Sequence, residues 1–429
     1  MERGNYLAPY RSLKTSARFK GETMQYVTNF SPPNAKPGDT LYVNFPSVKD
    51  ELIIPGTFSL TFDLEIVLDP AEPDTDVKTY PVHNLAANII SEFRVKIGSQ
   101  SIYELNNAHL YATYKDLWLT KEKRQNSVSR GICNFSTLAK DLVFRKIRTD
   151  LNTTLAASQG LNKLKQIYGK RYEIPINFEI ISDHMPMSGA LLESNLCFEI
   201  KINEVKNVLI YENKTTANFE MKNLCLEFKT IKDLILYKEI ERDFSAGVQF
   251  LFDHVHHYKM EEIDKEATFI NLEIQGLDRK SLKGILLIFE NEFKPGERSS
   301  ELFPNPGITN VKYTIDGIPN KHYSSGYRER DQWNEISQYF MPEEFKNIEI
   351  CNMDLLTYYT EGKFALWTDL RSTEDNRLHG TGKIHEAKHV IKMEITKNAG
   401  SSGKYIMHIY VISDARIIIK DRRLTNFEY

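Results

Sequence analysis

Hydrophobic and polar residues alternate along several stretches of the chain, most clearly at the start of residues 308–340. Val311, Tyr313 and Ile315 fall on one side of an extended segment, and polar residues fall on the other. This period of two predicts a half-buried strand. Gly317 follows at once and predicts a tight turn, because glycine adopts positive φ at little cost.

A tyrosine and a short amphipathic segment complete this unit. Tyr323 comes first, and Trp333, Ile336 and Phe340 then recur at the spacing of one helix face. A weaker copy occupies residues 89–119, with these members in the same order: Phe93, Val95 and Ile97, then Gly98 and Tyr103, then Leu110, Tyr114, Leu117 and Trp118. Two such units, half a chain apart, predict two copies of one β-rich module.

Further strands are predicted from alternation along both halves of the chain. The segments are 40–48, 57–68, 172–181, 196–202 and 219–230, then 247–263, 267–277, 283–293, 363–370, 389–397 and 404–429. Pro175 marks its strand as an edge or a bulge, because proline cannot donate to the ladder. Many strands and few helices predict a mostly-β fold of two sandwiches or barrels. We expect an arm over residues 1–38 and modules over 39–235 and 236–429, divided near the polar run KEIERD.

Composition agrees with two domains and excludes several classes of protein. A chain of 429 residues with 41% hydrophobic and 11% aromatic content can bury two cores. A net charge of −3 gives no whole-chain attraction to nucleic acid or anionic membrane. The four cysteines are widely spaced and predict reduced thiols. No apolar run approaches the ~18 residues of a membrane span, so none is expected.

The first 25 residues form a basic arm with little periodicity. Five cations stand against two carboxylates, 5 − 2 = +3: Arg3, Arg11, Lys14, Arg18 and Lys20. The arm is interpreted as a solvated segment, with contact to nucleic acid or a neighbouring subunit as the alternative. The basic run at 121–130 has no interleaved aromatic residues and is interpreted as a solvated loop.

One motif suggests metal chemistry. His254 and His256 alternate along a predicted strand and would share a face, and Glu261 follows, as in the first metal motif of cupin enzymes. The glycine expected after the glutamate is missing, and so is the second motif with its third histidine. We therefore predict no metal and no cofactor, and keep these three residues as the candidates for a bicupin-like metalloenzyme.

Other catalytic signatures are absent. The segment at 400–404, GSSGK, lacks the spacing of a phosphate-binding loop, and no G-x-S-x-G elbow occurs. A β-scaffold with long polar loops and no such signature favours a structural or binding protein over an enzyme.

Several segments resemble the major capsid (hexon) proteins of the Polinton/Maverick and adintovirus lineage. They are FALWTDLRSTEDNRLHGTGK at 364–383, YVISDARIIIKDRRLTNFEY at 410–429, the region 299–340, and PVHNLAANIISEFRVKIGSQSI at 81–102. The similarity covers roughly residues 40–429, and the insertion at 120–168 has no counterpart in it.

This resemblance implies a double jelly roll, with two eight-stranded antiparallel sandwiches and short helices in loops. It implies a homotrimeric, pseudo-hexameric capsomer that tiles an icosahedral virion, made in the host cytoplasm, with penton or minor capsid proteins as partners. The basic arm would then face the interior and packaged DNA. Structural roles fall to Gly98 and Gly317 in turns, to Tyr103 and Tyr323, and to Trp118 and Trp333, which would pack equivalent helices onto their rolls.

One alternative is a carbohydrate- or protein-binding double β-sandwich without catalysis. Such proteins carry exposed aromatic loops, and residues 355–359 (LLTYY) are a candidate for one. A minor capsid or penton role is less favoured, since a single jelly roll would not use this much chain.

Overall fold

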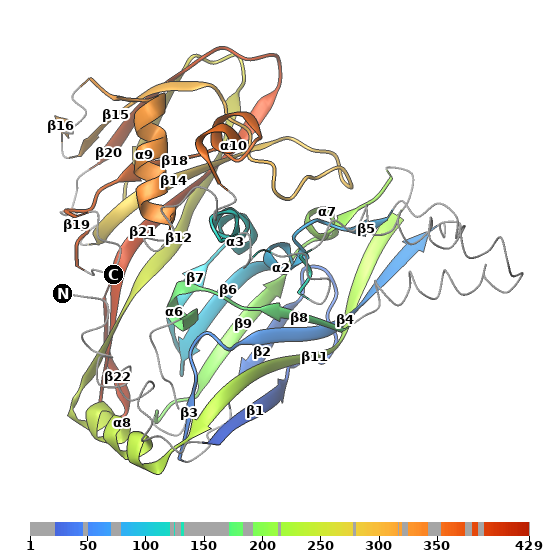
Figure 1. The fold of residues 1–429 in the computed structure, drawn as a ribbon, viewed down its shortest axis with the longest axis vertical. Coiled ribbons are helices and arrows are strands. Elements are labelled where there is room, and N and C mark those ends of the chain that lie inside the picture. The colour runs from blue at the N-terminus through green and yellow to red at the C-terminus, as the bar shows by residue number, and fades with distance from the viewer. Residues whose placement is uncertain are drawn as a thin grey trace, which may run out of the picture.

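The structure, a computed structural model, consists of two β-rich lobes. Figure 1 shows one lobe built from the first half of the chain, in blue and green, and one from the second half, in yellow to red. The described residues are 22–45, 50–69, 79–120, 124, 130–132, 171–182, 192–212, 216–277, 280–315, 317–319, 325–341, 353–373, 380–384 and 390–428.

The first lobe contains two antiparallel sheets and a short ladder. One sheet has the order β1 (Glu22–Asn29), β11 (Thr216–Lys232), β4 (Ser59–Asp69) and β8 (Arg171–Pro175), with β3 (Glu51–Ile53) also on β11. The other has the order β2 (Thr40–Asn44), β9 (Leu196–Ile202), β6 (Ile90–Ile97) and β7 (Gln100–Leu105). The short ladder pairs β5 (Tyr80–Pro81) with β10 (Leu209–Ile210).

The second lobe repeats this plan. One sheet has the order β12 (Val248–Asp264), β21 (Lys404–Lys420), β14 (Ser281–Asn291) and β18 (Ala365–Asp369), with β19 (Lys383–Ile384) and β22 (Arg423–Glu428) added. The other has the order β13 (Phe269–Ile274), β20 (Ile391–Lys397), β15 (Ile308–Ile315) and β16 (Ile318–Pro319), with β17 (Tyr327–Arg328) on β15.

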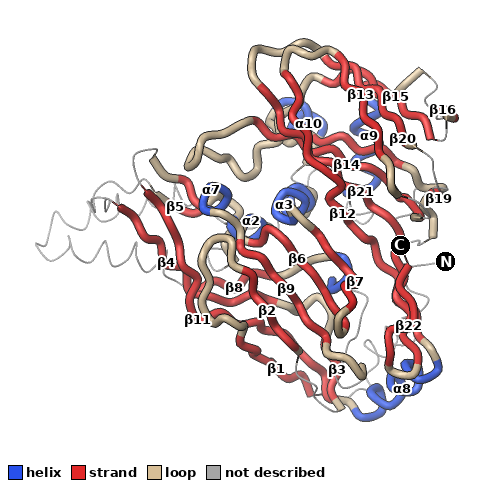
Figure 2. Tube along the Cα trace, turned by 180° about the vertical axis from the view of Figure 1, so that it is seen from behind, coloured by secondary structure: helices blue, strands red, loops and turns tan. Residues whose placement is uncertain are grey.

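The same strand order in both lobes defines the fold. In each lobe the first strand pairs with a long strand near the end of the lobe, β1 with β11 and β12 with β21. The second strand pairs in the other sheet with an earlier strand, β2 with β9 and β13 with β20. Two facing antiparallel sheets connected in this way form a jelly roll. The protein is therefore a mostly-β double jelly roll, as the sequence predicted, and Figure 2 shows the strands of both rolls from behind.

The core of each roll follows from the alternation in its strands. In β9 the buried positions are Leu196, Phe198, Ile200 and Ile202, and the residues between them are half-buried. Strand β20 buries its alternate residues in the same way. The hydrophobic effect, roughly 25 cal/mol per Å² of buried apolar surface, therefore acts on the inner face of each sheet.

The chain passes between the rolls through helix α8 (Leu234–Ala246), at the lower end of Figure 1. This helix contains the polar run KEIERD, near which the division between the modules was predicted. The Asp233 side chain caps it by accepting from the backbone N–H groups of Ile235 (3.0 Å) and Leu236 (3.1 Å). Leu236, Ile240 and Phe244 are buried at intervals of four, which is a helical signal within a run that looked polar as a whole.

Two other predicted segments differ from the structure. The arm assigned to residues 1–38 includes β1, which pairs with β11 along its whole length and so belongs to the first sheet. The strand predicted over 172–181 ends at Pro175, and Glu179–Ser182 form the helical turn α6. Strand β8 does lie at the edge of its sheet, as Pro175 indicated.

We expect Gly284→Ala to destabilise the second roll. A Cβ at this position would overlap the Trp367 ring and lie 2.7 Å from the Thr368 carbonyl oxygen. Overpacking of this kind costs about 1–3 kcal/mol. The urea midpoint should fall, and the fall caused by Gly284→Ala should be smaller when it is measured in a Trp367→Leu background, where the ring is absent. A midpoint equal to that of the wild type would show that the ring moves aside freely.

Candidate functional site

The junction between the two rolls is the region where the predicted structural residues meet. Helix α3 (Ala108–Leu117) follows β7, and helix α9 (Glu329–Phe340) follows β17 at the equivalent point of the second roll. In both views α3 lies between the lobes (Figures 1 and 2). The duplicated helices therefore belong to the contact between the rolls as well as to their own roll.

An aromatic cluster forms the centre of this junction. The ring of Trp118, at the end of α3, stacks on Trp333 of α9 with 5.7 Å between centroids and on Phe340 with 5.9 Å. Tyr114 meets Phe340 and Phe303 edge-on, at 5.6 and 5.5 Å. Trp118 is 1% exposed, whereas Trp333 is half-buried. The structure thus brings the two predicted tryptophans together.

A chain of polar contacts also connects the two rolls. The Asn107 amide lies 3.3 Å from His257 Nδ1, and His257 Nε2 lies 3.2 Å from His408 Nδ1. His408 Nε2 in turn lies 3.3 Å from Glu290 Oε2. One tautomer lets the Asn107 amide donate to His257 and lets His257 donate to His408. The chain joins the first roll, at Asn107, to three strands of the second.

Arg298 anchors the other side of the same glutamate. Its Nη2 lies 3.1 Å from Glu290 Oε1, and its Nη1–H donates to Asn88 Oδ1 in the first roll at 2.8 Å. Burial alone would raise the pKa of Glu290, but the hydrogen bond from His408 and the charge of Arg298 outweigh it and lower this pKa to about 2. Nothing in the sequence marks Arg298, because its partner Asn88 is 210 residues away.

The histidines of β12 are held neutral. Burial, and then the neighbouring His408, lower the pKa of His257 to about 4. Burial, and then the charge of Lys280, lower the pKa of His254 to about 3.

A second group of charges also connects the two rolls. Arg124 pairs with Asp116 of the first roll at 2.7 Å, and it also contacts Glu301 of the second roll.

The remaining predicted structural residues are spread over both rolls. Tyr103 is buried and donates to Glu179 Oε2 at 3.1 Å, and burial followed by that carboxylate raises its pKa. Gly98 and Gly317 have φ of +62° and +73° in equivalent hairpins. Tyr323 lies outside the described residues, as do all five basic residues of the arm.

The three candidate metal ligands do not converge. His254 and His256 stack with 6.4 Å between ring centroids, and His254 also meets the Tyr103 ring at 5.5 Å. Glu261 lies five residues beyond His256, roughly 16 Å along the strand, and pairs with Lys259. Among the described residues, no group of three or more His, Cys, Asp or Glu side chains is placed to hold a metal ion.

The segment proposed as an exposed aromatic loop is a helix, α10 (Leu355–Thr360). Tyr358 is fully buried and donates to the Ala365 carbonyl oxygen at 2.6 Å. The exposed side chains are the aliphatic Leu355 and Leu356. A binding platform of stacked aromatic rings is therefore not formed there, which removes the feature that favoured the carbohydrate-binding alternative.

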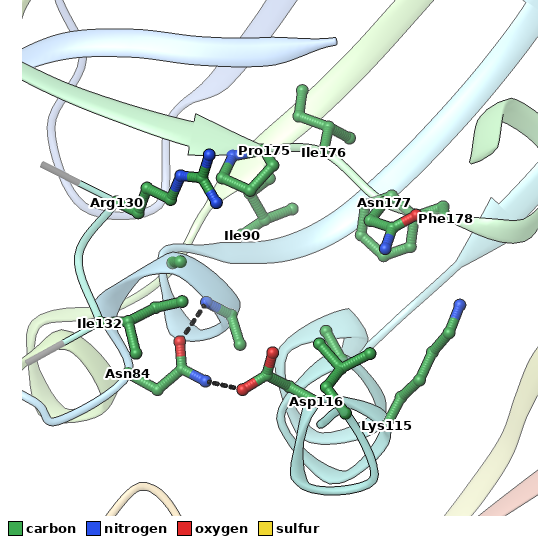
Figure 3. Close-up of a pocket in the computed structure, with 14 residues that line it drawn as sticks. Asn84, Ile90, Lys115, Asp116, Arg130, Ile132, Pro175, Ile176, Asn177 and Phe178 are labelled. Atoms are coloured by element: carbon green, nitrogen blue, oxygen red, sulfur yellow. Dashed lines mark hydrogen bonds between the residues drawn. The ribbon is translucent and has the colours of Figure 1, made fainter. Parts of the chain in front are cut away.

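The first roll also contains a cavity of about 390 Å³ beside α2 (Leu85–Asn88) and α3, shown in Figure 3. Its wall is largely apolar. Three of the polar side chains on it have partners: the Asn84 amide donates to Asp116 Oδ2 at 2.9 Å, and Lys115 pairs with Glu179 at 2.7 Å. These groups hold each other, so the cavity shows no convergent set of reactive side chains.

Comparison with known proteins identifies the fold. The chain aligns with the crystal structure of PBCV-1 VP54 fitted into a reconstruction of the virophage Sputnik, at 10% identity and a TM-score of 0.56, over 97% of this chain and 99% of that one. It aligns with the mavirus major capsid protein at 8% identity and a TM-score of 0.53, over 94% and 89%. It aligns with the PBCV-1 virus capsid at 10% identity and a TM-score of 0.55, over 95% and 97%.

These similarities are structural. No family model matches the chain, and no curated protein matches it in sequence. At such low identity the alignments establish the double jelly roll itself, including its duplication, over nearly the whole chain. Every helix in the described part of the chain is too short or too polar to span a bilayer.

We expect Trp118→Ala to cost about 3–5 kcal/mol of stability, as for other fully buried aromatic residues. Trp333→Ala should cost less, because its ring is half-buried. The double variant should reveal a coupling of about 0.5–1.5 kcal/mol from the stacked pair. Phe269→Ala, at a 52% exposed ring, is the control and should change little. Strictly additive effects of the two tryptophans would contradict the stacking.

Stability should fall in acid in two steps. The histidines have folded pKa values below the ordinary 6.5, so the unfolded chain binds more protons as pH falls from 6.5 to about 4. Glu290 acts in the same direction between 4.5 and about 2. The urea midpoint should therefore be constant above pH 6.5 and decline below it.

The control for this pH dependence is His257→Gln, which removes one titrating group from the junction. Its midpoint should decline less steeply between pH 6.5 and 4 than that of the wild type. A wild-type midpoint that stays flat from pH 7 to 4 would contradict the assignment of neutral, buried histidines.

Proposed function

We propose that this protein is the major capsid protein of a virus, and that three copies form a pseudo-hexameric capsomer of an icosahedral shell. The observation that carries the proposal is the extent of the structural match. Two rolls in the same order account for nearly the whole chain and nearly the whole of each aligned protein. The aligned proteins include one named as a major capsid protein and one described as a virus capsid.

The physics of the fold supports such a role. Jelly rolls protect most of their strand edges, which suits a protein that must pack densely without uncontrolled strand pairing. A ring of three subunits needs a heterologous interface that closes. Two similar but non-identical rolls in one chain provide the two different surfaces that such an interface requires.

The finer assignment rests on the sequence resemblance. We propose the Polinton/Maverick and adintovirus type, residence in the virion after synthesis in the host cytoplasm, and penton or minor capsid proteins as neighbours. We also propose rolls over 39–235 and 236–429, with β1 added to the first, and no enzymatic activity.

The purified protein should be a stable trimer. Light scattering at micromolar concentration should give three times the mass of the 49.7 kDa chain. The same preparation should yield pseudo-hexagonal particles by electron microscopy. A monomer that persists at high concentration would contradict the capsomer.

We further propose that the basic arm faces the interior of the shell and contacts packaged DNA. Residues 1–21, which precede β1, hold five cations and one carboxylate, 5 − 1 = +4. Replacing the five cations by glutamine should leave the trimer intact and reduce the DNA retained by assembled particles, with the difference shrinking in high salt. Equal DNA content in the two kinds of particle would refute this role.

A further inference from the structure

Three charged side chains are buried together in the second roll. They are Lys283 on β14, Asp253 on β12 and Asp414 on β21, with side-chain exposures of 2%, 7% and 9%. The Lys283 Nζ lies 2.7 Å from Asp253 Oδ1 and 3.2 Å from Asp414 Oδ1. The nitrogen of an amine is thus held against one carboxyl group with a second carboxyl group beside it.

The backbone fixes this arrangement. Asp253 and Asp414 are direct partners in the β12–β21 ladder, so both side chains lie on one face. Lys283 is the residue at which the β14–β21 register shifts, between Leu282 and Gly284. A bulge of this kind re-aims a side chain, and the Lys283 amine reaches past the central strand to Asp253.

The two carboxyl groups have different surroundings. Asp414 Oδ2 accepts from the Ser281 hydroxyl at 2.7 Å and from the Gly382 backbone N–H at 3.0 Å. Two donors favour the charged form of that carboxylate. Asp253 has its Oδ2 3.3 Å from the Tyr339 hydroxyl, which can polarise the carboxyl group as charge develops on it. Asp414 is therefore held in place beside the Lys283 amine, where it can accept a proton, and the nearer carboxyl group, that of Asp253, is placed to be attacked.

We propose that Lys283 and Asp253 condense to form an intramolecular isopeptide bond, with Asp414 as the proton acceptor. In the first step a proton passes from the Lys283 ammonium to Asp253, which gives the neutral amine that can act as a nucleophile and a carboxylic acid. Nζ then adds to Cγ of Asp253, Asp414 takes a proton from Nζ and returns it to the departing hydroxyl, and one water molecule leaves. The step needs no oxidant, reductant or other reactant.

Holding the amine against the carboxyl group accelerates a reaction that would otherwise be slow. Groups held in a productive geometry reach effective molarities on the order of 10⁵ M or more. The bond would connect β12 to β14 across β21 and close a loop between residues 30 apart in sequence. A covalent link of this type constrains the unfolded chain as a disulfide does, without depending on the redox state of the compartment.

Intact-mass measurement of the purified full-length chain tests the proposal. The expected mass is that of the sequence less one water molecule, and a tryptic digest should contain a branched peptide that joins Asp253 to Lys283. A chain at its full sequence mass, with a linear peptide cleaved after Lys283, would overturn the proposal whether or not any variant folds.

Three variants separate the roles. The Lys283→Arg variant should have the full mass calculated from its own sequence, because it lacks the amine that forms the bond. The Asp414→Asn variant should fold but remain unlinked. If this variant forms the bond at the wild-type rate, Asp414 is not the proton acceptor. Asp253→Asn should give the same amide with loss of ammonia in place of water. A cyclic imide at Asp316-Gly317 also loses water, but it would persist in Lys283→Arg, so this variant distinguishes the two.

Discussion

The two rolls can be packed against each other only if every charge trapped between them has a partner. Glu290 shows the constraint most clearly, because only 13% of its side chain is exposed and it is still held in its charged form by Arg298 and His408. Removing one member would leave an uncompensated buried charge, which typically costs about 3–5 kcal/mol. Because Arg298 also reaches Asn88 of the first roll, this requirement fixes the orientation of one roll on the other.

Aromatic stacking and the polar chain contribute in different ways. The stacked rings of Trp118, Trp333 and Phe340 remove apolar surface from water and stabilise the contact without directional demands beyond ring packing. Buried ion pairs add little net stability, but any other orientation of the two rolls would leave a buried charge without its partner and would be less stable. Together they favour one orientation of the first roll on the second.

The repeated unit was visible in sequence because alternation and turn glycines are local signals. Phe93, Val95 and Ile97 face the core, as predicted from a period of two, and the equivalent segment of the second roll does the same. The helix α8 was missed because its charged residues, read as a polar run, concealed buried residues spaced four apart. Contacts between the rolls could not be predicted, since Arg298 and Asn88, or Trp118 and Trp333, are brought together only by the relative placement of two folded modules.

Differential scanning calorimetry of the whole chain tests the rigid junction most directly. Because the contact between the rolls is buried and its charges are paired, we predict one cooperative transition in which both rolls unfold together at neutral pH. Two separate transitions of comparable size, with the first unaffected by Trp118→Ala, would show that the rolls are independent domains. That result would contradict the claim that the junction joins the two rolls into one cooperative unit.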